Sequence, residues 1–480
     1  MASFMKVTSF PVNGVSVGLN TWGGRRRNTA FGIRTDRYHS PTRERPVAVQ
    51  ALPIAARPGK DAGRAADGAT AWAEARRSAY DSATPLRPER VPLGEANGRT
   101  LASDLLALQE MPHYASSAMD GWTTNGAGPW ILTEPGEPLG RGQASPVVTG
   151  GLIPPGAQGV LRVEHGLLAT DAAGRAILTA GGGASPGEPH QGQHIRKSGE
   201  ESAAGEMLVS AGTILNPAHI ALAAVAGFDH LDVRGKPLVR MLVTGSEVVT
   251  AGIPAPGQVR DAFGPQISPI IQMLGGVPGS MIRIGDTYEE WLTALGASDP
   301  PFGRWSDVIV TTGGTGRSGA DHFRTATAAL GGRLLIDGIA MRPGHPAALA
   351  KLPNGRFVLG LPGNPLAALM ALFTLGGPLL AALGHQPLAD VSRVSCGTVI
   401  DAHSAPTRLM PFHWVKGLAT PAHYTGPGML RGLASADGVI VVPSCGVQLG
   451  EPVPAFALPW RPELRPPLPH ESRGENQWHA

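Results

Sequence analysis

Charged and aromatic residues are scarce in this sequence. Lys, Arg, Asp and Glu together make up 16% of its 480 residues and aromatic residues 5%, whereas 42% are hydrophobic. A chain this apolar lies outside the composition typical of disordered proteins, so we expect it to fold. We find no run of about 18 apolar residues, from which we predict that no helix spans a membrane.

The two cysteines, Cys396 and Cys445, lie far apart and have no CxxC or Cys/His spacing around them. This excludes a disulfide framework and a cysteine-based zinc site, and it fits a reducing compartment, so we expect a cytoplasmic protein. The 15 histidines show no HExxH or similar pattern, so we assign none of them to a metal.

The positive charge of the chain is concentrated at one end. A pI near 9.0 would ordinarily indicate a nucleic-acid partner. However, residues 1–60 carry 10 Lys/Arg and 2 Asp/Glu, a net charge of +8. Because the whole chain has a net charge of +3, residues 61–480 carry +3 − 8 = −5. We therefore predict no nucleic-acid partner. The basic segment resembles an organelle transit peptide, but a disordered extension or a misassigned start codon also explains it.

A chain of 480 residues exceeds one hydrophobic core and predicts about three domains. Two helical patterns, 70–83 and 217–227, flank a Gly/Pro-rich stretch with short apolar pieces, which indicates a β insertion in a discontinuous domain. The expected limits are a disordered basic tail at 1–67, a discontinuous N-terminal domain at 68–104 and 191–235, a small β domain at 105–190, an α/β domain at 236–386, a C-terminal β domain at 387–462 and a tail at 463–480.

Within residues 236–385, apolar strands alternate with helices. Strands are expected near 238–243, 280–284 and 307–312, and helices near 266–275, 288–296 and 321–330. Two further strands, 347–350 and 357–361, precede a helix at 365–383. This alternation predicts βαβ units and a parallel sheet, whose ligands bind beyond the carboxyl ends of the strands.

One glycine-rich loop lies at such a strand end. It begins at Gly313 and contains a Gly-x-Gly-x-x-Gly spacing, with Asp337 about 20 residues on, as in dinucleotide-binding proteins. Glycines let a backbone approach a phosphate, and the following helix offers free N–H groups. Here the loop follows the third strand, and Gly319 precedes the expected helix cap Asp321, which disfavours a nicotinamide cofactor. We predict a loop that binds another phosphate.

Seven groups of short motifs occur in order along the chain: SSAMDGW (116–122), VVTGG with IPPGA (147–157), IRKSGEE (195–201), TGSEV (244–248), GGTGRSGAD (313–321), MRPGHP (341–346) and GLPGNPLAAL (360–369). Together they closely resemble the molybdopterin molybdenumtransferases, or molybdenum insertases, over roughly residues 68–460.

The resemblance implies the architecture and the reaction. It implies an elongated homodimer of four-domain subunits: a three-layer α/β molybdopterin-binding domain, a discontinuous N-terminal α+β linker domain, a small β insertion domain and a C-terminal β domain. It also implies that adenylylated molybdopterin and molybdate bind as substrates. A Mg²⁺-dependent step then releases AMP and leaves molybdenum on the dithiolene, in molybdenum cofactor biosynthesis.

The resemblance also implies a site shared between subunits, with Asp120, Glu200 and Asp321 as catalytic residues and Mg²⁺ ligands. Each acid has another explanation: a tight Asp-Gly turn for Asp120, a capping box from Ser198 to Glu201 around Glu200, and a helix N-cap for Asp321. Carboxylates suit Mg²⁺, and a reaction of this kind needs positioning and charge but no side-chain nucleophile.

Fifteen residues are expected to hold molybdate and the pterin or its phosphate: Thr244, Gly245, Ser246, Gly313, Gly314, Thr315, Gly316, Arg342, Pro343, Gly344, His345, Pro362, Gly363, Asn364 and Pro365. Arg342 supplies a permanent positive charge. The prolines and glycines have a simpler alternative role, which is to shape two turns.

Some positions depart from the family pattern. Gly338, Arg342 and His345 stand where lysine is common, Ala262-Phe263 replaces Ser-Asn after Asp261, and Pro427 replaces a serine. Arg342 keeps a charge, whereas a histidine need not be charged at neutral pH. The acidic residues are retained, while the expected positive charges around the anion are fewer.

The resemblance implies small-molecule substrates and, as protein partners, an upstream molybdopterin adenylyltransferase and downstream apo-molybdoenzymes. Two other functions stay open. One is the adenylyltransferase reaction itself, which ATP-dependent formation of adenylylated molybdopterin would reveal. The other is a catalytically weak paralogue that acts as a binding scaffold, since the gephyrin E domain of this family also binds receptor segments.

Overall fold

The computed structural model describes residues 68–297, 304–316 and 322–466. The basic N-terminal segment, Gly319, Asp321 and the last part of the expected C-terminal tail therefore lie outside the described residues.

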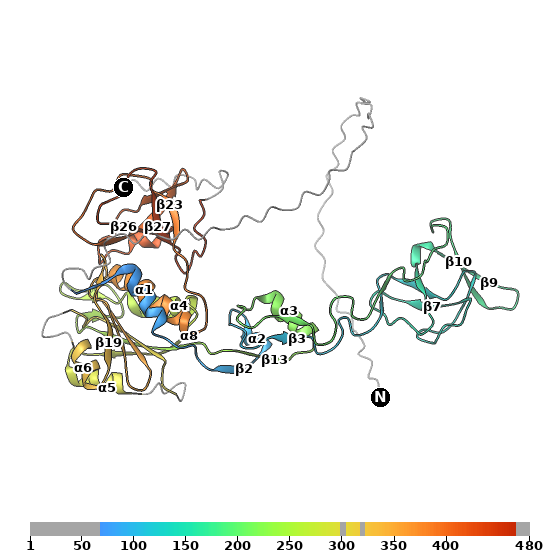
Figure 1. Cartoon of the computed structure of the whole chain (residues 1–480), viewed down its shortest axis with the longest axis horizontal. Helices are drawn as coiled ribbons and strands as arrows, with labels where there is room; N and C mark the ends of the chain where they lie inside the picture. The colour runs from blue at the N-terminus through green and yellow to red at the C-terminus, as the bar shows by residue number, and fades with distance from the viewer. Residues whose placement is uncertain (1–67, 298–303, 317–321, 467–480) are drawn as a thin grey trace, which may run out of the picture. The chain divides into compact units, whose positions relative to one another are not determined.

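A six-stranded sheet forms the centre of the α/β domain (Figure 1). Its strand order is β17-β14-β18-β22-β21-β19, with bounds Val277–Ile284, Leu238–Thr244, Val308–Thr312, Phe357–Leu361, Ala348–Lys351 and Arg333–Asp337. The first four strands and β19 run in the same direction, whereas β21 runs antiparallel to both of its neighbours, β22 and β19. The α/β fold is confirmed, but the sheet is mixed, because the short link from β21 to β22 permits only an antiparallel hairpin.

Helices cover both faces of this sheet. On one face, Met241, Val310 and Leu359 pack with α1 (Trp72–Asp81), α4 (Phe263–Met273) and the helix that begins at Pro365. On the other face, the neighbouring residues Leu242, Ile309 and Val358 pack with α5 (Tyr288–Gly296) and α6 (Phe323–Ala329). Successive apolar side chains of a strand thus enter two different cores, as expected for a sheet buried on both faces. Two layers of helices with the sheet between them give the three layers seen in Figure 1.

The central helix corrects the expectation that no apolar segment is long enough to span a membrane. It consists of α7 (Pro365–Ala371), a π-helical turn (Leu372–Gly376) and α8 (Gly377–Leu383). By length and composition these 19 residues, with a hydropathy of 2.1, are sufficient to cross a bilayer. Within this helix, Thr374, two glycines and a proline interrupt the run of apolar residues, but the helix contains no charged residue. Because 89% of the apolar window is buried inside the protein, this segment is a core helix.

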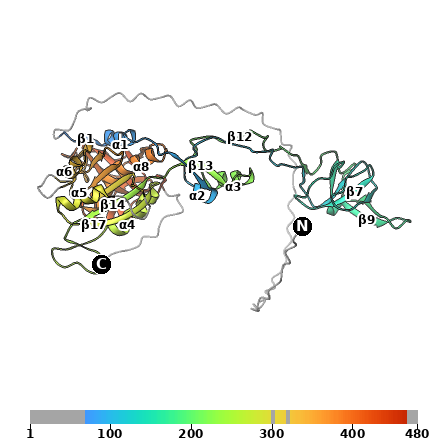
Figure 2. The same cartoon turned by 90° about the horizontal axis from the view of Figure 1, so that it is seen from below.

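The first helix also lies in a different place from the expected one. We expected it to join the 217–227 helix in the discontinuous domain, but α1 packs beside α8 (Figure 1 and Figure 2). The preceding β1 (Thr70–Ala71) pairs with β20 (Ile339–Ala340), and Trp72 Nε1 donates to Thr374 Oγ1 at 3.1 Å. Periodicity identifies an apolar face but not the core against which it packs, so the sequence alone could not place this helix.

Three short ladders organise the rest of the discontinuous domain. They pair β2 (Pro88–Pro92) with β13 (His230–Arg234), β3 (Leu105–Leu106) with β12 (Met207–Val209), and β4 (Ser116–Ser117) with β11 (Ile195–Arg196). α2 (Leu93–Ala96) and α3 (Pro217–Val225) cover the first ladder, and α3 has Pro217 at its start and Gly227 just beyond its end, as expected. Because β3 pairs with β12, residues 105 and 106, which we expected in the inserted domain, form part of a ladder of the discontinuous domain.

Two further sheets complete the chain. The insertion forms a sheet in the order β8-β5-β7-β6-β10-β9, with bounds Gly159–Arg162, Gly121–Thr124, Gln143–Val147, Trp130–Leu132, Ala176–Ala180 and Gly166–Thr170. The C-terminal sheet has the order β23-β27-β26-β24-β25, with bounds Ser392–Ser395, Pro452–Phe456, Gly438–Pro443, Thr407–Val415 and Leu418–Pro421; α9 (Arg431–Ala434) precedes β26. Each sheet packs one face on a small apolar core of its own.

The docking of α1 yields a prediction about stability. Trp72 is 7% exposed and belongs to the main core, so Trp72→Ala is expected to lower the free energy of unfolding of the α/β domain by about 3–5 kcal/mol. Calorimetric unfolding measures the loss. Trp305, which is 48% exposed, is the matched control, and Trp305→Ala is expected to cost about 1 kcal/mol or less. Equal losses would contradict this placement of α1.

Candidate functional site

The carboxyl ends of β14, β18 and β22 border a cavity of about 860 Å³. Seven of the predicted binding residues line it: Thr244, Gly245, Gly313, Gly314, Gly363, Asn364 and Pro365. They come from three loops that are remote in sequence and that follow neighbouring strands. The rule that ligands of such sheets bind beyond the strand ends therefore locates a cavity here.

A second cavity, of about 360 Å³, adjoins the first. Arg342, Pro343, Gly344, His345 and Pro362 line it, and Asn364 lines both cavities. The turns RPGHP and LPGNP, which are separated by 14 residues in the chain, thus border one space. Asn364 at the boundary is exposed, so its amide faces the cavities and not the core.

Two consecutive glycines shape the loop after β18. Gly313 and Gly314 have φ of +80° and +62°, a conformation that side chains rarely adopt. A Cβ on Gly314 would also lie 2.4 Å from Cζ2 of the buried Trp291. Both glycines are therefore required by the backbone path, which lets the main chain form the cavity wall.

Arg324 holds the next part of this loop in place. Its Nη1 donates to the backbone oxygens of Thr315 and Gly316 at 2.8 and 2.7 Å, and its Nη2 and Nε donate to Asp337 Oδ1 at 2.5 and 2.8 Å. Thr315 is 3% exposed and does not line the cavity, and Gly316 does not line it either. Asp337 thus supports the loop and is not placed as the ribose-binding acid that a nicotinamide site requires.

Ser246 lies beside the large cavity but does not line it. Its backbone N–H donates to Asp286 Oδ2 at 3.3 Å, and Asp286 does line the cavity. Thr244 is tied to the neighbouring strand, because its Oγ1 donates to the Thr312 oxygen at 2.6 Å. The TGS loop is therefore held against the two strands that flank it.

The smaller cavity is positively charged. Its described lining contains Arg342 and Arg408 and no carboxylate. Arg408 comes from β24 of the C-terminal sheet, where Arg342 N donates to Thr407 O at 2.8 Å and Leu409 N donates to Arg342 O at 2.8 Å. His345 Nδ1 donates to Ile339 O at 2.8 Å, which leaves Nε2 available to the cavity. The guanidinium of Arg342 thus stands at a position where lysine is common in the family, and Arg408 adds a second guanidinium.

Three carboxylates line the large cavity: Glu247, Asp261 and Asp286. Burial alone would raise the pKa of Asp261, but hydrogen bonds from Gly264 N and Phe263 N and the ion pair with Arg283 lower it below its ordinary value. The Asp261 carboxylate therefore accepts hydrogen bonds at the start of α4 and pairs with Arg283. Glu247 and Asp286 are the cavity acids without an ion pair among the described residues.

Three residues of the cavity walls, Glu247, Asp286 and Arg408, were not among those predicted from the sequence. Glu247 lies inside the TGSEV motif, and Asp286 follows the carboxyl end of β17. The rule that ligands bind beyond the carboxyl ends of the strands could therefore have identified both residues. Arg408 had no such signal, because only the folded C-terminal sheet brings it to Arg342.

Asp120 and Glu200 lie at opposite ends of one short ladder. In the β4–β11 pair, Ser117 faces Ile195 and Ser116 faces Arg196, so the chain leaves the ladder in opposite directions toward the two acids. Thr149 donates its N–H and its hydroxyl to Asp120 Oδ1 at 2.6 and 2.9 Å, and these bonds lower the pKa of Asp120. Neither acid lines the two cavities, whose described walls come from residues 244–430.

A shared metal role for these acids stays a prediction. Asp321 lies outside the described residues, and among residues 68–297, 304–316 and 322–466 no group of three or more His, Cys, Asp or Glu could hold a metal ion. The alternative capping box can be set aside, because residues 197–202 form turns and no helix begins there. Instead, Ser198 Oγ donates to Glu110 Oε2 at 2.5 Å.

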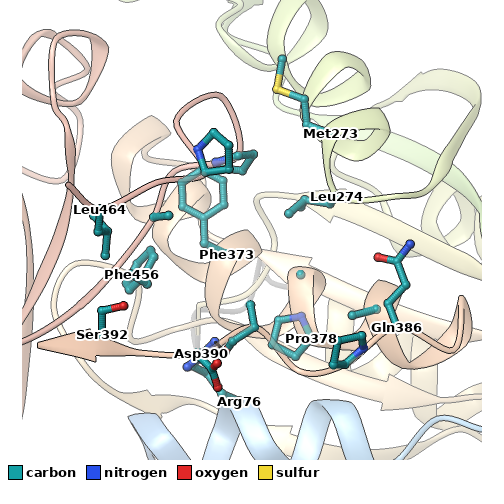
Figure 3. Close-up of a pocket in the computed structure, with 17 residues that line it drawn as sticks. Arg76, Met273, Leu274, Phe373, Pro378, Gln386, Asp390, Ser392, Phe456 and Leu464 are labelled. Atoms are coloured by element: carbon teal, nitrogen blue, oxygen red, sulfur yellow. Dashed lines mark hydrogen bonds between the residues drawn. The ribbon is translucent and has the colours of Figure 1, made fainter. Parts of the chain in front are cut away.

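A third cavity, of about 410 Å³, lies on another side of the α/β domain (Figure 3). Phe373, Phe456 and Leu464 give it an apolar wall, and Arg76 and Asp390 lie together at one end. Leu274, also in its wall, shortly precedes the start of β17, so this cavity lies toward the amino ends of the strands. None of the predicted site residues that the structure describes lines it, and we place the site in the other two cavities.

The comparisons with known proteins agree with this geometry. Residues 70–227 match the family described as the MoeA N-terminal region (domain I and II), and residues 240–382 match a probable molybdopterin binding domain. The molybdopterin molybdenumtransferase of Synechococcus elongatus is 31% identical over 345 residues, which cover 64% of this chain and 80% of the relative. The chain belongs to the molybdopterin molybdenumtransferase family.

Other members of the molybdopterin molybdenumtransferase family are similar over comparable lengths. Molybdopterin molybdenumtransferase 2 of Mycobacterium tuberculosis is 29% identical over 393 residues, covering 76% of this chain and 93% of the relative. The crystal structure of a molybdopterin biosynthesis MoeA protein from Pyrococcus horikoshii aligns with a TM-score of 0.63 at 25% identity, covering 81% of this chain and 99% of that one. The family and the multidomain fold expected from the motifs are confirmed.

The glycine loop of the site yields a prediction. Gly314→Ala is expected to lower the free energy of unfolding by about 1–3 kcal/mol, because it adds a left-handed alanine and a clash with Trp291. Gly363→Ala is the matched control in the same cavity, since a Cβ there meets nothing closer than the Gly313 Cα at 4.0 Å. Thermal unfolding of both variants checks this, and a loss as large in Gly363→Ala would refute it.

Proposed function

We propose that this protein transfers molybdenum from molybdate to adenylylated molybdopterin and releases AMP. The observation that carries the proposal is the pair of adjoining cavities. One is bordered by the glycine loop at the strand ends, and the other by two arginines with no described carboxylate. A phosphate-bearing substrate and a small oxyanion would then bind side by side, with Asn364 between them.

The smaller cavity suits molybdate, which is a dianion. Arg342 and Arg408 supply two permanent charges, and a guanidinium can donate two parallel N–H groups to an oxyanion. The missing lysine at position 338 is explained by the backbone, because Gly338 has a φ of +87°, where a lysine would be strained. The charge that the family pattern places there is supplied in this chain by arginine.

The large cavity suits the pterin and its adenylate. Gly313 and Gly314 let the main chain approach a phosphate closely. Catalysis in this arrangement depends on holding the oxyanion and the phosphate bond in place, and no nucleophilic side chain is required. The enzyme would accept its substrate from a molybdopterin adenylyltransferase and deliver its product to apo-molybdoenzymes.

Mg²⁺ fits the donors of the large cavity. This ion is usually bound through one or two carboxylates together with substrate phosphates and waters. Glu247 and Asp286 are two such carboxylates in the wall, and Asp321 lies a few residues beyond the glycine loop. When bound, the ion would neutralise charge on the phosphate groups, while these side chains would orient it.

Asp120 and Glu200 complete the proposed site in a homodimer. The described walls of both cavities come from residues 244–430, so these two acids would reach the cavities of a second copy of the chain. A mass measurement by light scattering tests this, since a monomer that releases AMP would exclude a shared site.

The first experiment measures AMP release from adenylylated molybdopterin with Mg²⁺, with and without molybdate, together with activation of an apo-molybdoenzyme. Molybdate-dependent release that is lost in Asp321→Ala is expected. ATP-dependent formation of adenylylated molybdopterin would instead favour the adenylyltransferase. Release that Asp321→Ala leaves unchanged, or no release at all, would favour a binding scaffold.

The arginine pair yields a quantitative prediction. Arg342→Gln and Arg408→Gln are each expected to raise the half-saturating molybdate concentration by about tenfold or more, because each removes a charge-assisted hydrogen bond of about 1.5–3 kcal/mol. Arg393→Gln, on β23 and outside both cavity walls, is the control and should leave it unchanged. An unchanged value in Arg408→Gln would show that the anion binds elsewhere.

A further inference from the structure

A fourth cavity, of about 330 Å³, lies at the amino edge of the six-stranded sheet. Trp305 and Asp307, which line it, come just before β18, and Arg356, in the same wall, comes just before β22. Lys351 lines it from the end of β21, which runs in the opposite direction to β22. The glycine loop lies at the other edge, and the five residues of β18 separate the two edges by roughly 13 Å. None of the described lining residues of this cavity lines either cavity of the proposed site.

Trp305 presents a flat aromatic surface in the wall of this cavity. It is 48% exposed, although tryptophan is largely buried in most proteins. The guanidinium carbon of Arg356 lies 4.3 Å from the centroid of the Trp305 ring and covers one face of it. Arg356 is itself only 7% exposed, and its Nη2 and Nη1 donate to Leu295 O and Ala297 O at 3.0 and 3.4 Å. The ring therefore rests on a fixed cation, which leaves its opposite face open for stacking.

The charge of the described lining favours an anion. Lys351 and Arg356 are opposed there by Asp307, which gives a net charge of +2 − 1 = +1. Arg304 also pairs with Asp307, at 3.3 Å. Lys351 Nζ donates to Ser82 O at 3.3 Å, which uses one N–H group of the ammonium and leaves the others for a ligand.

Polar groups in the same wall can bond to the edge of a heteroaromatic ring. Asn354 Oδ1 accepts from Arg356 N at 3.2 Å, so the amide N–H groups of Asn354 are left for a ligand. Asp307 Oδ2 accepts from Leu238 N at 2.8 Å, whereas Oδ1 accepts no bond from a described residue. Ser306 is 1% exposed, and its hydroxyl has no hydrogen-bond partner among the described residues. Because unpaired polar groups are costly, a ligand with donors and acceptors fits this wall better than an apolar one.

We propose that this cavity binds a nucleoside monophosphate. The base stacks on the open face of Trp305, and the phosphate pairs with Lys351. Asn354 donates to the edge of the base, and Asp307 Oδ1 accepts from it. The volume of the cavity lies within the range of about 300–1,000 Å³ that is usual for small-molecule sites. A ligand bound at this edge does not reach the glycine loop, so the site is separate from that of the proposed reaction.

Two tryptophans distinguish this site from the large cavity in one experiment. In protein labelled with 5-fluorotryptophan, the ¹⁹F resonances that disappear in Trp305→Phe and in Trp291→Phe are assigned to these rings. Trp291 reports on the large cavity, because a Cβ on Gly314 would lie 2.4 Å from its Cζ2. AMP is expected to shift the Trp305 resonance in a saturable manner, whether or not it shifts that of Trp291.

Both parts of the nucleotide are expected to contribute to binding. Adenosine, which lacks the phosphate, should need an about tenfold or higher concentration to half-saturate the Trp305 shift. Ribose 5-phosphate, which lacks the base, should displace AMP only at an about tenfold or higher excess. Lys351→Met is expected to raise the half-saturating AMP concentration by about tenfold or more. Lys416→Met, which removes the same charge from an exposed turn outside the cavity, is the control and should leave it unchanged.

Three results would each overturn the proposal: a Trp305 resonance that AMP leaves in place, adenosine that binds as tightly as AMP, or equal AMP binding by Lys351→Met and Lys416→Met. If Lys351→Met does not fold, the comparison of AMP with adenosine on the wild type decides. A shift of Trp291 without one of Trp305 would place AMP in the large cavity alone, in agreement with the proposed function and against this second site. A shift of Trp305 alone would support the second site and count against nucleotide binding in the large cavity.

Discussion

The parallel register of β14, β18 and β22 is the constraint on which the site depends. Thr312 pairs with Val243 on one side and with Leu361 on the other, so the three strands end at the same level. The loops that follow therefore begin side by side. Hydrogen bonds from Thr244 Oγ1 to Thr312 O and from Gly313 N to Leu361 O fasten these ends together. A shift of one residue would exchange the two apolar faces of a strand, and both cores oppose it.

A second constraint brings the C-terminal sheet to this edge. The backbone of Arg342 pairs with Thr407 and Leu409 through two hydrogen bonds, and this contact places Arg408 in the wall of the smaller cavity. The loop after β25 adds Pro427, whose oxygen accepts from Ala367 N at the start of the central helix. The smaller cavity thus owes its charge to residues from two sheets, neither of which forms it alone.

Sequence patterns predicted the parts of this structure that depend on local rules. Alternating apolar runs located five of the six strands of the α/β sheet, all except β19, and the glycine and proline turns located part of both cavity walls. The patterns failed where distant packing decides the outcome. The apolar face of α1 carries no mark of the core that receives it, and the helix from Pro365 to Leu383 is apolar because the protein surrounds it. Asp337 has the spacing of a ribose ligand, yet Arg324 binds it in support of the loop.

The distribution of charge between the two cavities bears on how the substrates are kept apart. The described lining of the large cavity carries charges of both signs, with Glu247 and Asp286 opposed by Arg260, whereas that of the smaller one has Arg342 and Arg408 and no carboxylate. In the proposed function, a cation held by these two carboxylates would screen the charge of a phosphate-bearing ligand, which is what a Mg²⁺-dependent step requires. Because Asn364 lies at the boundary of both cavities, the two proposed anions would meet at a neutral amide. In the proposed reaction, the cation would therefore allow the phosphate to bind, and the arginines would hold the oxyanion beside it.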